Sequence, residues 1–289
     1  YSHIYKYNPD GRSYQDASTI LSMFQFNHFI NEKMFYDISF SLTNNDFGSY
    51  VFEDYNSYKI IDEDGIYQGQ YHFSGDTIYN YVHDKYSTAF GSGFFTGGQD
   101  KGHLNRTIIT RNFKTDLTYQ ITNAHSIKTG FSYFDYKLEN IYHTIRNEFA
   151  GTALEADSYK PVVLPDSTVY SDSFLVRPRE WSFYIQDKFE KEDIVINYGL
   201  RYDVFDANTT YPSQRRNPIN ASTYYIKNIS GSDSLDLNGD FILDSARISM
   251  PIKSNTTWQL SPRFGFAYQL GNVAVLHFSY GHFLQMPPM

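Results

Sequence analysis

Apolar and aromatic side chains occupy every second position over long stretches of the chain, most clearly between residues 258 and 281. A period of two predicts a β-strand with one apolar face. The alternation pauses at residues 270–272 and then restarts, which predicts two antiparallel strands joined by a tight turn. The apolar series comprises Trp258, Leu260, Pro262, Phe264, Phe266 and Tyr268, followed by Ala274, Leu276, Phe278 and Tyr280.

The length of these runs separates two explanations for the alternation. A half-buried strand of a soluble sandwich also alternates, but it spans about five or six residues, whereas these runs reach about ten to twelve. A strand that crosses a bilayer needs roughly nine to eleven residues, with lipid-facing apolar side chains alternating with lumen-facing polar ones. The polar Gln259, Arg263 and Gln269 occupy the second face and suit a wet lumen. The pattern therefore favours membrane-spanning strands.

The same hairpin pattern occurs four times along the chain. The sequence thus predicts an all-β fold, namely a transmembrane antiparallel β-barrel segment of about eight strands in four hairpins. The hairpins span about residues 18–42, 111–138, 180–205 and 258–284.

Long polar intervals separate the hairpins, at about 44–105, 145–175 and 207–257. Short turns at one end and long loops at the other are typical of outer-membrane barrels, with the turns in the periplasm and the loops outside the cell. We therefore expect residues 1–289 to be part of one outer-membrane β-barrel domain, without a plug domain. The long extracellular loops are the expected place for ligand binding.

Composition agrees with a barrel in a bacterial outer membrane. Aromatic residues make up 18% of the chain, with 27 Tyr and 24 Phe, and membrane barrels need aromatic girdles at both interfaces. The sequence has no run of 18 or more apolar residues, so no transmembrane helix is expected. It has no cysteine, which excludes disulfides and thiolate metal sites, and its net charge of -8 argues against a nucleic-acid partner.

Three segments carry a resemblance to a known family. WSFYIQDKFEKEDIVINYGLRYDVFD at 181–206, LSPRFGFAYQL at 260–270 and FSYGHFLQMPP at 278–288 resemble, in this order, the barrel of TonB-dependent outer-membrane receptors, particularly the large receptors of Bacteroidetes-like bacteria. The resemblance implies active uptake of a bulky nutrient such as an iron chelate, a cobalamin-like molecule or an oligosaccharide. It also implies a partnership with the inner-membrane TonB energy-transducing complex, besides contact with outer-membrane lipid.

The resemblance leaves several alternatives open. Barrels of this family have 22 strands around a plugged lumen, whereas the chain supplies about eight strands and has no recognisable plug or TonB box, so we expect an internal segment of a longer receptor. A small closed barrel acting as an adhesin or structural surface protein is one alternative. A soluble β-rich glycan-binding module is another. A surface lipoprotein is a further partner on which the sequence is silent.

A candidate calcium site lies in the third long interval. Carboxylates and an amide recur there at positions that place hard oxygens on one side of a tight loop, as Ca²⁺ loops require. Counted from Asp236 as position 1, position 12 is Arg247, where a calcium loop has a bidentate glutamate. A plain polar turn is therefore the alternative. The candidate ligands are Asp236, Asn238, Asp240 and Asp244.

Other loop residues are candidates for ligand contact. The pair Arg215 and Arg216, with nearby Tyr224 and Tyr225, would suit an anionic ligand at the mouth of the barrel, or else be solvated loop residues. Loop aromatics would either stack on a ligand or pack within the loops. These aromatics are Tyr50, Phe52, Tyr55, Tyr58, Phe94 and Phe95.

Charged residues of the strands are expected to line the lumen and to pair with each other or with a plug. They are Lys114, Asp116, Asp187, Lys188, Arg201, Asp203 and Arg263. Catalytic motifs are missing: the sequence contains no nucleophile elbow, phosphate-binding loop or dinucleotide fingerprint, and its nine histidines show no metal-binding spacing. We therefore expect a protein that is not an enzyme.

Overall fold

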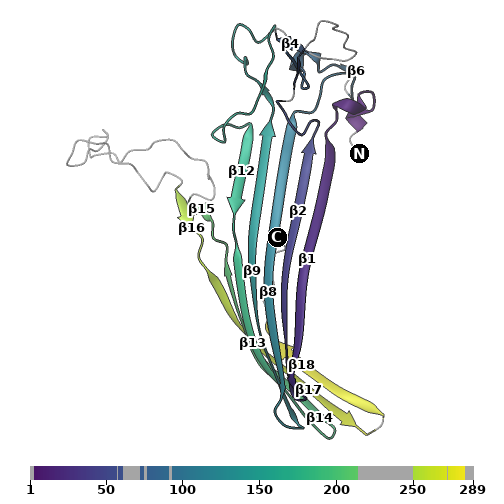
Figure 1. The fold of residues 1–289 in the computed structure, drawn as a ribbon, viewed down its shortest axis with the longest axis vertical. Helices are drawn as coiled ribbons and strands as arrows, with labels where there is room; N and C mark the ends of the chain where they lie inside the picture. The colour runs from purple at the N-terminus through teal and green to yellow at the C-terminus, as the bar shows by residue number, and fades with distance from the viewer. Residues whose placement is uncertain are drawn as a thin grey trace, which may run out of the picture.

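Eight long antiparallel strands in a single sheet dominate the computed structural model, which describes residues 3–56, 58–60, 72–74, 77–90, 93–213, 250–271 and 273–283. The sheet order follows the chain, so each strand lies beside its sequence neighbours (Figure 1). The long strands are β1 (Tyr14–Asn31), β2 (Met34–Tyr50), β8 (Gly102–Gln120), β9 (His125–Thr144), β13 (Arg179–Lys191), β14 (Ile194–Asp206), β17 (Thr257–Leu270) and β18 (Ala274–Gly281).

Shorter elements belong to the connections between the long strands. β12 (Ser171–Val176) pairs with the upper part of β9, and β13 pairs with the lower part. The others are η1 (His3–Tyr5), η2 (Pro9–Gly11), β3 (Tyr58–Ile60), β4 (His72–Ser74), β5 (Thr77–Tyr79), η3 (Asp84–Tyr86), β6 (Ala89–Phe90), β7 (Phe94–Phe95), β10 (Arg146–Asn147), β11 (Pro161–Val162), β15 (Thr210–Pro212) and β16 (Pro251–Lys253). Within the described ranges, no helix is long and apolar enough to cross a membrane.

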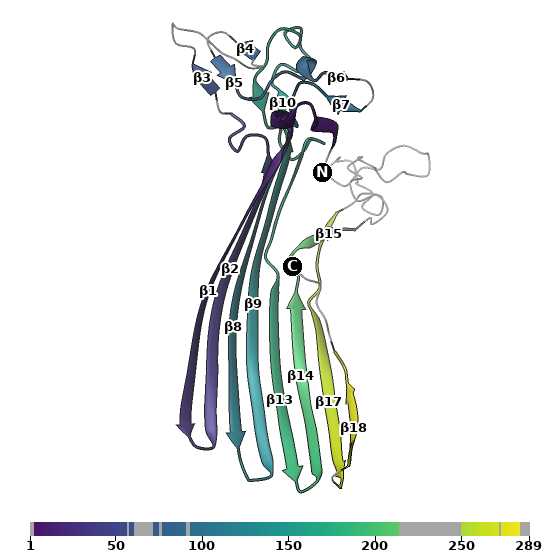
Figure 2. The same cartoon turned by 90° about the vertical axis from the view of Figure 1, so that its right-hand side faces the viewer.

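The four hairpins predicted from the alternation are confirmed as β1–β2, β8–β9, β13–β14 and β17–β18. All four turns lie at one end of the sheet and the long connections at the other (Figure 2). Two residues connect β13 to β14, and Glu192 in this turn has a φ of 54°, the left-handed conformation that tight hairpins use. The short turns are periplasmic and the long loops extracellular.

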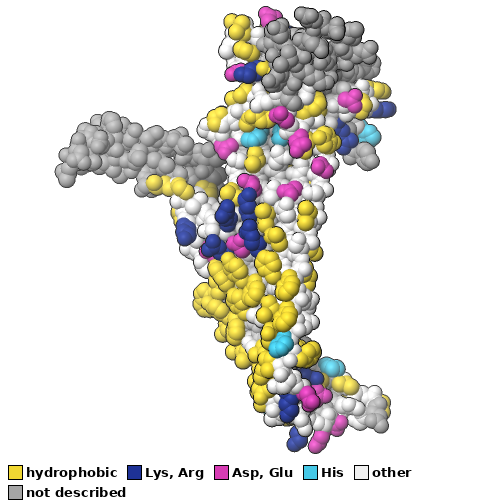
Figure 3. Space-filling model, in the orientation of Figure 1, with side chains coloured by type: hydrophobic (Ala, Val, Ile, Leu, Met, Phe, Trp, Pro, Cys, Tyr) yellow, Lys and Arg dark blue, Asp and Glu magenta, His cyan; other side chains and the backbone are white. Residues whose placement is uncertain are grey.

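Pairing register collects the apolar residues into a band on one face of the sheet. Tyr202 of β14 lies opposite Phe183 of β13 and Leu260 of β17, and directly opposite side chains share a face. Along β14 this face runs from Ile194 to Val204, about 33 Å of strand and roughly 25 Å of depth after a tilt of about 40°. Figure 3 shows the band in yellow, with charged side chains above and below it. The band is the lipid-facing surface.

Strands on one side of the sheet continue well beyond the membrane. β1, β2, β8 and β9 have 17 to 20 residues, whereas β13, β14 and β17 have 13 or 14. The sequence pattern placed the start of the first loop at residue 44, but β2 continues to Tyr50 and β8 begins at Gly102. Here Asp46 accepts hydrogen bonds from Asn44 (2.6 Å) and Thr107 (2.8 Å). Both faces meet water at this height, so the apolar alternation disappears while the backbone pairing persists.

The two outer strands of the sheet do not pair with each other in the described part of the chain. Every residue of β1 is exposed, and so is β18 up to Tyr280. The eight strands therefore form a curved wall with two open edges.

Candidate functional site: an extracellular crown above the lumen wall

The first and second long connections fold against each other above the sheet. We call their described parts, within residues 51–101 and 145–170, the crown. Its core is formed by Val51, Tyr81, Ile145 and Tyr159, each at most 7% exposed. Phe52 packs edge-on against Tyr81, with ring centroids 5.2 Å apart. Because this core joins segments about 60 to 100 residues apart, the crown is a folded unit and not two separate loops.

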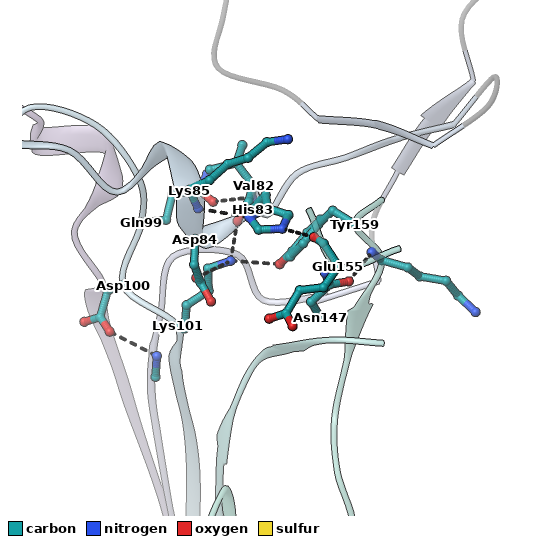
Figure 4. Close-up of polar contacts among 12 residues, drawn as sticks. Val82, His83, Asp84, Lys85, Gln99, Asp100, Lys101, Asn147, Glu155 and Tyr159 are labelled. Atoms are coloured by element: carbon teal, nitrogen blue, oxygen red, sulfur yellow. Dashed lines mark hydrogen bonds and ion pairs between the residues drawn. The ribbon is translucent and has the colours of Figure 1, made fainter. Parts of the chain in front are cut away.

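Lys101 is the central polar group of the crown (Figure 4). Its ammonium donates to the Tyr159 hydroxyl at 2.8 Å and to the backbone carbonyl of Val82, and lies 3.4 Å from Asp84. It also lies 4.6 Å from the centre of the Tyr159 ring. Burial lowers the pKa of Lys101 to about 8, and the neighbouring Asp84 carboxylate opposes this effect. The amine is thus a polar junction between both loops.

Two further side chains fasten the same junction. Gln99 accepts a hydrogen bond from the Val82 backbone N–H (2.9 Å) and donates to the carbonyl of Asn80 (2.9 Å). His83 accepts from the Lys85 backbone N–H through Nδ1 (2.9 Å), so its Nε2 carries the hydrogen and donates to the carbonyl of Glu155 (2.5 Å). The His83 contact holds the first connection to the second, whereas the Gln99 contacts tie two parts of the first connection together (Figure 4).

The N-terminal segment before β1 also forms hydrogen bonds to the crown. Asn8 donates to the carbonyl of Gly98 (2.7 Å), and Asp100 accepts from the Ser13 hydroxyl (3.0 Å). Gly98 has a φ of 80°, and a β-carbon there would meet Ser87, so this tight approach requires glycine. The segment before β1 is therefore part of the extracellular structure.

Aromatic side chains in the crown and next to it pack against one another. Tyr50 is 5% exposed and stacks on His103, which Tyr55 also contacts edge-on. Phe94 and Phe95 pack against Tyr7 and Tyr5, with ring centroids 5.2 Å apart in each pair. With Phe52 on Tyr81, five of the six candidate loop aromatics thus have packing partners. The sixth, Tyr58, belongs to β3, and its side chain lies outside the described residues.

The lumen wall just below the crown is rich in aromatic residues. Phe134 lies opposite Asn112 and Glu180, so it faces away from the lipid-facing band. Its ring stacks on that of Tyr136 at 5.9 Å and 7°. On the same face, Arg106 donates to Asn140 (3.2 Å) and Phe174 is 49% exposed. We call Arg106, Phe134, Tyr136, Asn140 and Phe174 the upper wall. Sequence analysis missed it because the alternation there has apolar residues on the lumen side.

The lower lumen wall is polar and internally paired. Asp116 forms an ion pair with Lys114 at 2.8 Å and accepts a hydrogen bond from Tyr184, and Arg201 pairs with Asp203 at 2.8 Å. These four charged residues pair with each other as the sequence predicted. The guanidinium of Arg263 lies over the Phe283 ring, 5.1 Å from its centre. Both residues line a shallow hollow of about 560 Å³, together with Gly199, Gly265 and Gly281, which have no side chains to fill it.

One lumen prediction is wrong. Asp187 cannot share the lumen face with Lys188, because neighbouring strand residues point to opposite faces. Its carboxylate lies opposite Tyr198 and Ile127, on the lipid-facing side. Lys188 faces the lumen and pairs with Glu190 at 2.5 Å.

The loop candidates lie outside the described residues. These are Arg215, Arg216, Tyr224 and Tyr225 for an anionic ligand, and Asp236, Asn238, Asp240 and Asp244 for calcium. Among the residues with described positions, no group of three or more His, Asp or Glu side chains is arranged to hold a metal ion.

Structural comparison gives distant similarities. The ferric-catecholate import receptor Fiu from E. coli K12, in its open form, is 12% identical, with a TM-score of 0.43 over 93% of this chain and 36% of the receptor. The closed form of the same receptor is 12% identical, with a TM-score of 0.39 over 93% of this chain and 33% of the receptor. The toluene transporter TodX from Pseudomonas putida is 9% identical, with a TM-score of 0.32 over 93% of this chain and 56% of the transporter. The chain thus spans about a third of the length of the Fiu receptor. No curated protein matches the sequence.

A comparison with family models gives an assignment that covers nearly the whole chain. Residues 3–289 match the model described as an outer membrane beta barrel domain. The match confirms the location in the bacterial outer membrane, and it confirms the resemblance seen in the sequence at the level of an outer-membrane barrel. It also removes the soluble glycan-binding alternative. The chain belongs to the outer membrane beta barrel domain family.

Proposed function

We propose that this chain forms part of the wall of an outer-membrane receptor that takes up a bulky nutrient in a TonB-dependent manner. In this proposal the chain binds and guides its ligand and performs no chemistry on it. The ligand classes are an iron chelate, a cobalamin-like molecule or an oligosaccharide. The energy comes from the inner-membrane TonB complex through a plug.

The observation that carries this proposal is that the lumen wall is aromatic at its extracellular end and charged further down. The upper wall offers stacked rings beside Arg106 and Asn140, which suit a ligand with both flat apolar surfaces and polar groups. Below it, paired charges such as Lys114–Asp116 and Arg201–Asp203 provide a polar surface. A ligand held at the upper wall would thus lie above a polar passage.

The open sheet supports a wide barrel over a small one. A closed eight-stranded barrel has an interior filled with its own side chains. Here β1 and β18 do not pair within the described ranges, and lumen-side residues such as Phe174 remain about half-exposed. An adhesin or structural barrel of eight strands would instead need both edges to meet. Intact mass measurement of the polypeptide from its native membrane separates the two: a value two or three times 33.6 kDa supports the receptor, and a value of 33.6 kDa the small barrel.

The test of function uses cells that carry the intact receptor. Lipid-free extracts of the purified receptor are analysed by mass spectrometry to find the bound molecule, and its uptake is then measured. We expect uptake to stop when the TonB complex is deleted, while surface binding persists.

Replacing Phe134 and Tyr136 by alanine tests where the ligand binds. Loss of two stacked aromatic contacts lowers affinity by about 2 kcal/mol, or roughly thirtyfold. The matched control replaces Phe94, whose ring packs on Tyr7 in the crown. Uptake that is independent of TonB, or affinity that is equal in all three proteins, would contradict the proposal.

A further inference from the structure

Aromatic side chains mark the extracellular border of the lipid-facing band. Trp181 of β13 lies directly opposite Tyr133 of β9 and opposite Val204, the last band residue of β14. The ring centroids of Tyr133 and Trp181 are 5.7 Å apart. Tyr and Trp gather at membrane–water boundaries, because one end of each ring is apolar and the other is polar. The next residues on this face, about 5 Å higher for tilted strands, therefore lie at the level of the lipid headgroups.

Two arginines occupy this level on the outward face. Arg179 of β13 lies two residues above Trp181. Arg111 of β8 lies two residues above Phe113, which is directly opposite Tyr133. The side chains of Arg179 and Arg111 are 47% and 49% exposed. Figure 3 shows Lys and Arg side chains gathered directly above the apolar band. The outward face thus changes from apolar to charged within two residues of each strand.

One carboxylate, that of Asp135, lies between the two arginines. Asp135 of β9 is directly opposite both of them in the sheet. Its Oδ2 is 2.8 Å from Nη1 of Arg111, and its Oδ1 is 3.6 Å from Nε of Arg179. Each of these contacts uses one of the five N–H donors of a guanidinium group. Two positive charges thus share one negative charge, and one positive charge is in excess.

Two other acidic side chains on this face have contacts of their own. Asp206 of β14 lies directly opposite Arg179, and its Oδ1 accepts a hydrogen bond from the backbone N–H of Asn208 (2.9 Å). Glu139, further up β9, forms an ion pair with Lys137 at 2.7 Å. Neither acidic group forms an ion pair with the two arginines in the described part of the chain. The two guanidinium groups therefore remain open to an external anion.

We propose that Arg111 and Arg179 bind a phosphate on the sugar headgroup of a glycolipid in the outer leaflet of the outer membrane. Guanidinium groups form bidentate, charge-assisted hydrogen bonds with phosphate oxygens. The acyl chains of the same lipid lie along the band below, where Phe183 and Ile185 of β13 are 49% and 45% exposed. A soluble anion would contact the arginines and leave this apolar surface uncovered. A phosphorylated lipid matches both surfaces at once, and it binds independently of the nutrient in the lumen.

The test compares two glycolipids that differ only in their phosphates. The intact receptor is purified from the outer membrane and equilibrated with equal amounts of lipid A and of the same lipid after removal of its phosphates. Native mass spectrometry then counts the retained molecules of each. A chelator is present throughout, because Mg²⁺ would otherwise bridge phosphate to the nearby acidic residues. We expect the phosphorylated lipid to be retained roughly fivefold over the other.

Three variants locate the preference. The double variant Arg111→Gln and Arg179→Gln removes both cations and should abolish it. Lys191→Gln is the matched control, because Lys191 lies on the same face of β13 at its periplasmic end; it should keep the preference. Asp135→Asn removes the shared carboxylate and spares both arginines, so it should keep or increase the preference. If the arginines served only to hold the strands together, Asp135→Asn would instead lose the preference with the double variant.

Heat-modified gel mobility checks that each variant is folded. If the double variant does not fold, the single variant Arg179→Gln replaces it and should lower the preference. Equal retention of both lipids by the wild-type receptor would overturn the proposal. An unchanged preference in the arginine variant, or its loss in Asp135→Asn, would do the same.

Discussion

The hydroxyl of Tyr184 on β13 donates a hydrogen bond to Asp116 on β8, although the whole of β9 lies between these two strands. The tyrosine ring crosses β9 at Gly130, which pairs directly with both residues. A β-carbon at this position would collide with the ring and with the carboxylate. The lower lumen wall is thus tied across three strands, and glycine makes room for the tie.

Replacing Gly130 by alanine should therefore destabilise the barrel. The added methyl group displaces Tyr184 and breaks its bond to Asp116, at a cost of about 1–3 kcal/mol. The free energy of unfolding in lipid vesicles measures this effect. Gly265→Ala is the control, because Gly265 also belongs to a spanning strand and a β-carbon there meets Asn197 at an ordinary 3.7 Å. Equal stability of the two variants would show that the tie has no energetic role.

The crown should become more stable between pH 8 and pH 10. Burial holds the pKa of Lys101 at about 8, below its value of 10.5 in the unfolded chain, so in this window the unfolded state binds more protons and stability rises with pH. The gain is about 1–3 kcal/mol. Above pH 10 the trend reverses, because burial raises the pKa of Tyr81 and Tyr159, which keep their protons when folded. Hydrogen exchange of crown amides against pH measures the change.

Lys101→Met should remove this pH dependence and leave crown stability flat from pH 8 to pH 10. Lys160→Met is the matched control, because Lys160 forms an exposed ion pair with Glu148 at 2.7 Å. This control should retain the rise. A rise that survives in Lys101→Met would assign the effect to another group.

Charge on the lipid-facing band should be far more disruptive than charge in the lumen. Leu200 lies within the band, and an arginine there costs about 2–4 kcal/mol near the middle of the bilayer. Asn197→Arg places the same side chain on the lumen face of the same strand and should cost less than 1 kcal/mol. The folded fraction after refolding into vesicles, read from heat-modified gel mobility, compares the two variants. Similar losses for both would mean that the faces are assigned wrongly.

Calcium binding by the third long connection remains a sequence prediction. If Asp236 and Asp240 are ligands, calorimetric titration of the intact receptor with Ca²⁺ should release heat, and the double asparagine variant should not. Absence of heat from the wild-type receptor would leave this segment as a plain polar turn.

The spanning strands were predictable because one physical rule governs them. Membrane crossing imposes a period of two, and residues such as Trp258, Leu260 and Phe264 follow it without exception. Applied strictly, the same rule would have placed Asp187 correctly, since Lys188 cannot share its face. The expectation that charged groups avoid lipid led to the error. Pairing with His125 is a contact between strands far apart in sequence, which no local pattern reveals.

The crown was not predictable either, because its contacts also join segments that are far apart in the sequence. Lys101 owes its environment to Asp84 and Tyr159, one before and one after it, in segments without alternation. The upper wall was missed because Phe134 and Tyr136 face a lumen expected to be polar. The alternation of apolar and polar residues identifies the side chains that face lipid. It does not identify a binding surface, whose aromatic residues face the lumen.

The unequal lengths of the strands give the barrel wall a slanted rim (Figure 2). β1, β2, β8 and β9 raise the crown far above the membrane, while β13 and β14 end near the top of the apolar band. Phe134 and Tyr136 belong to the tall β9 and lie just above the level of Val204, the last residue of the apolar band on β14. These rings therefore lie in the aqueous phase, and a solute does not need to enter the hydrocarbon layer to contact them.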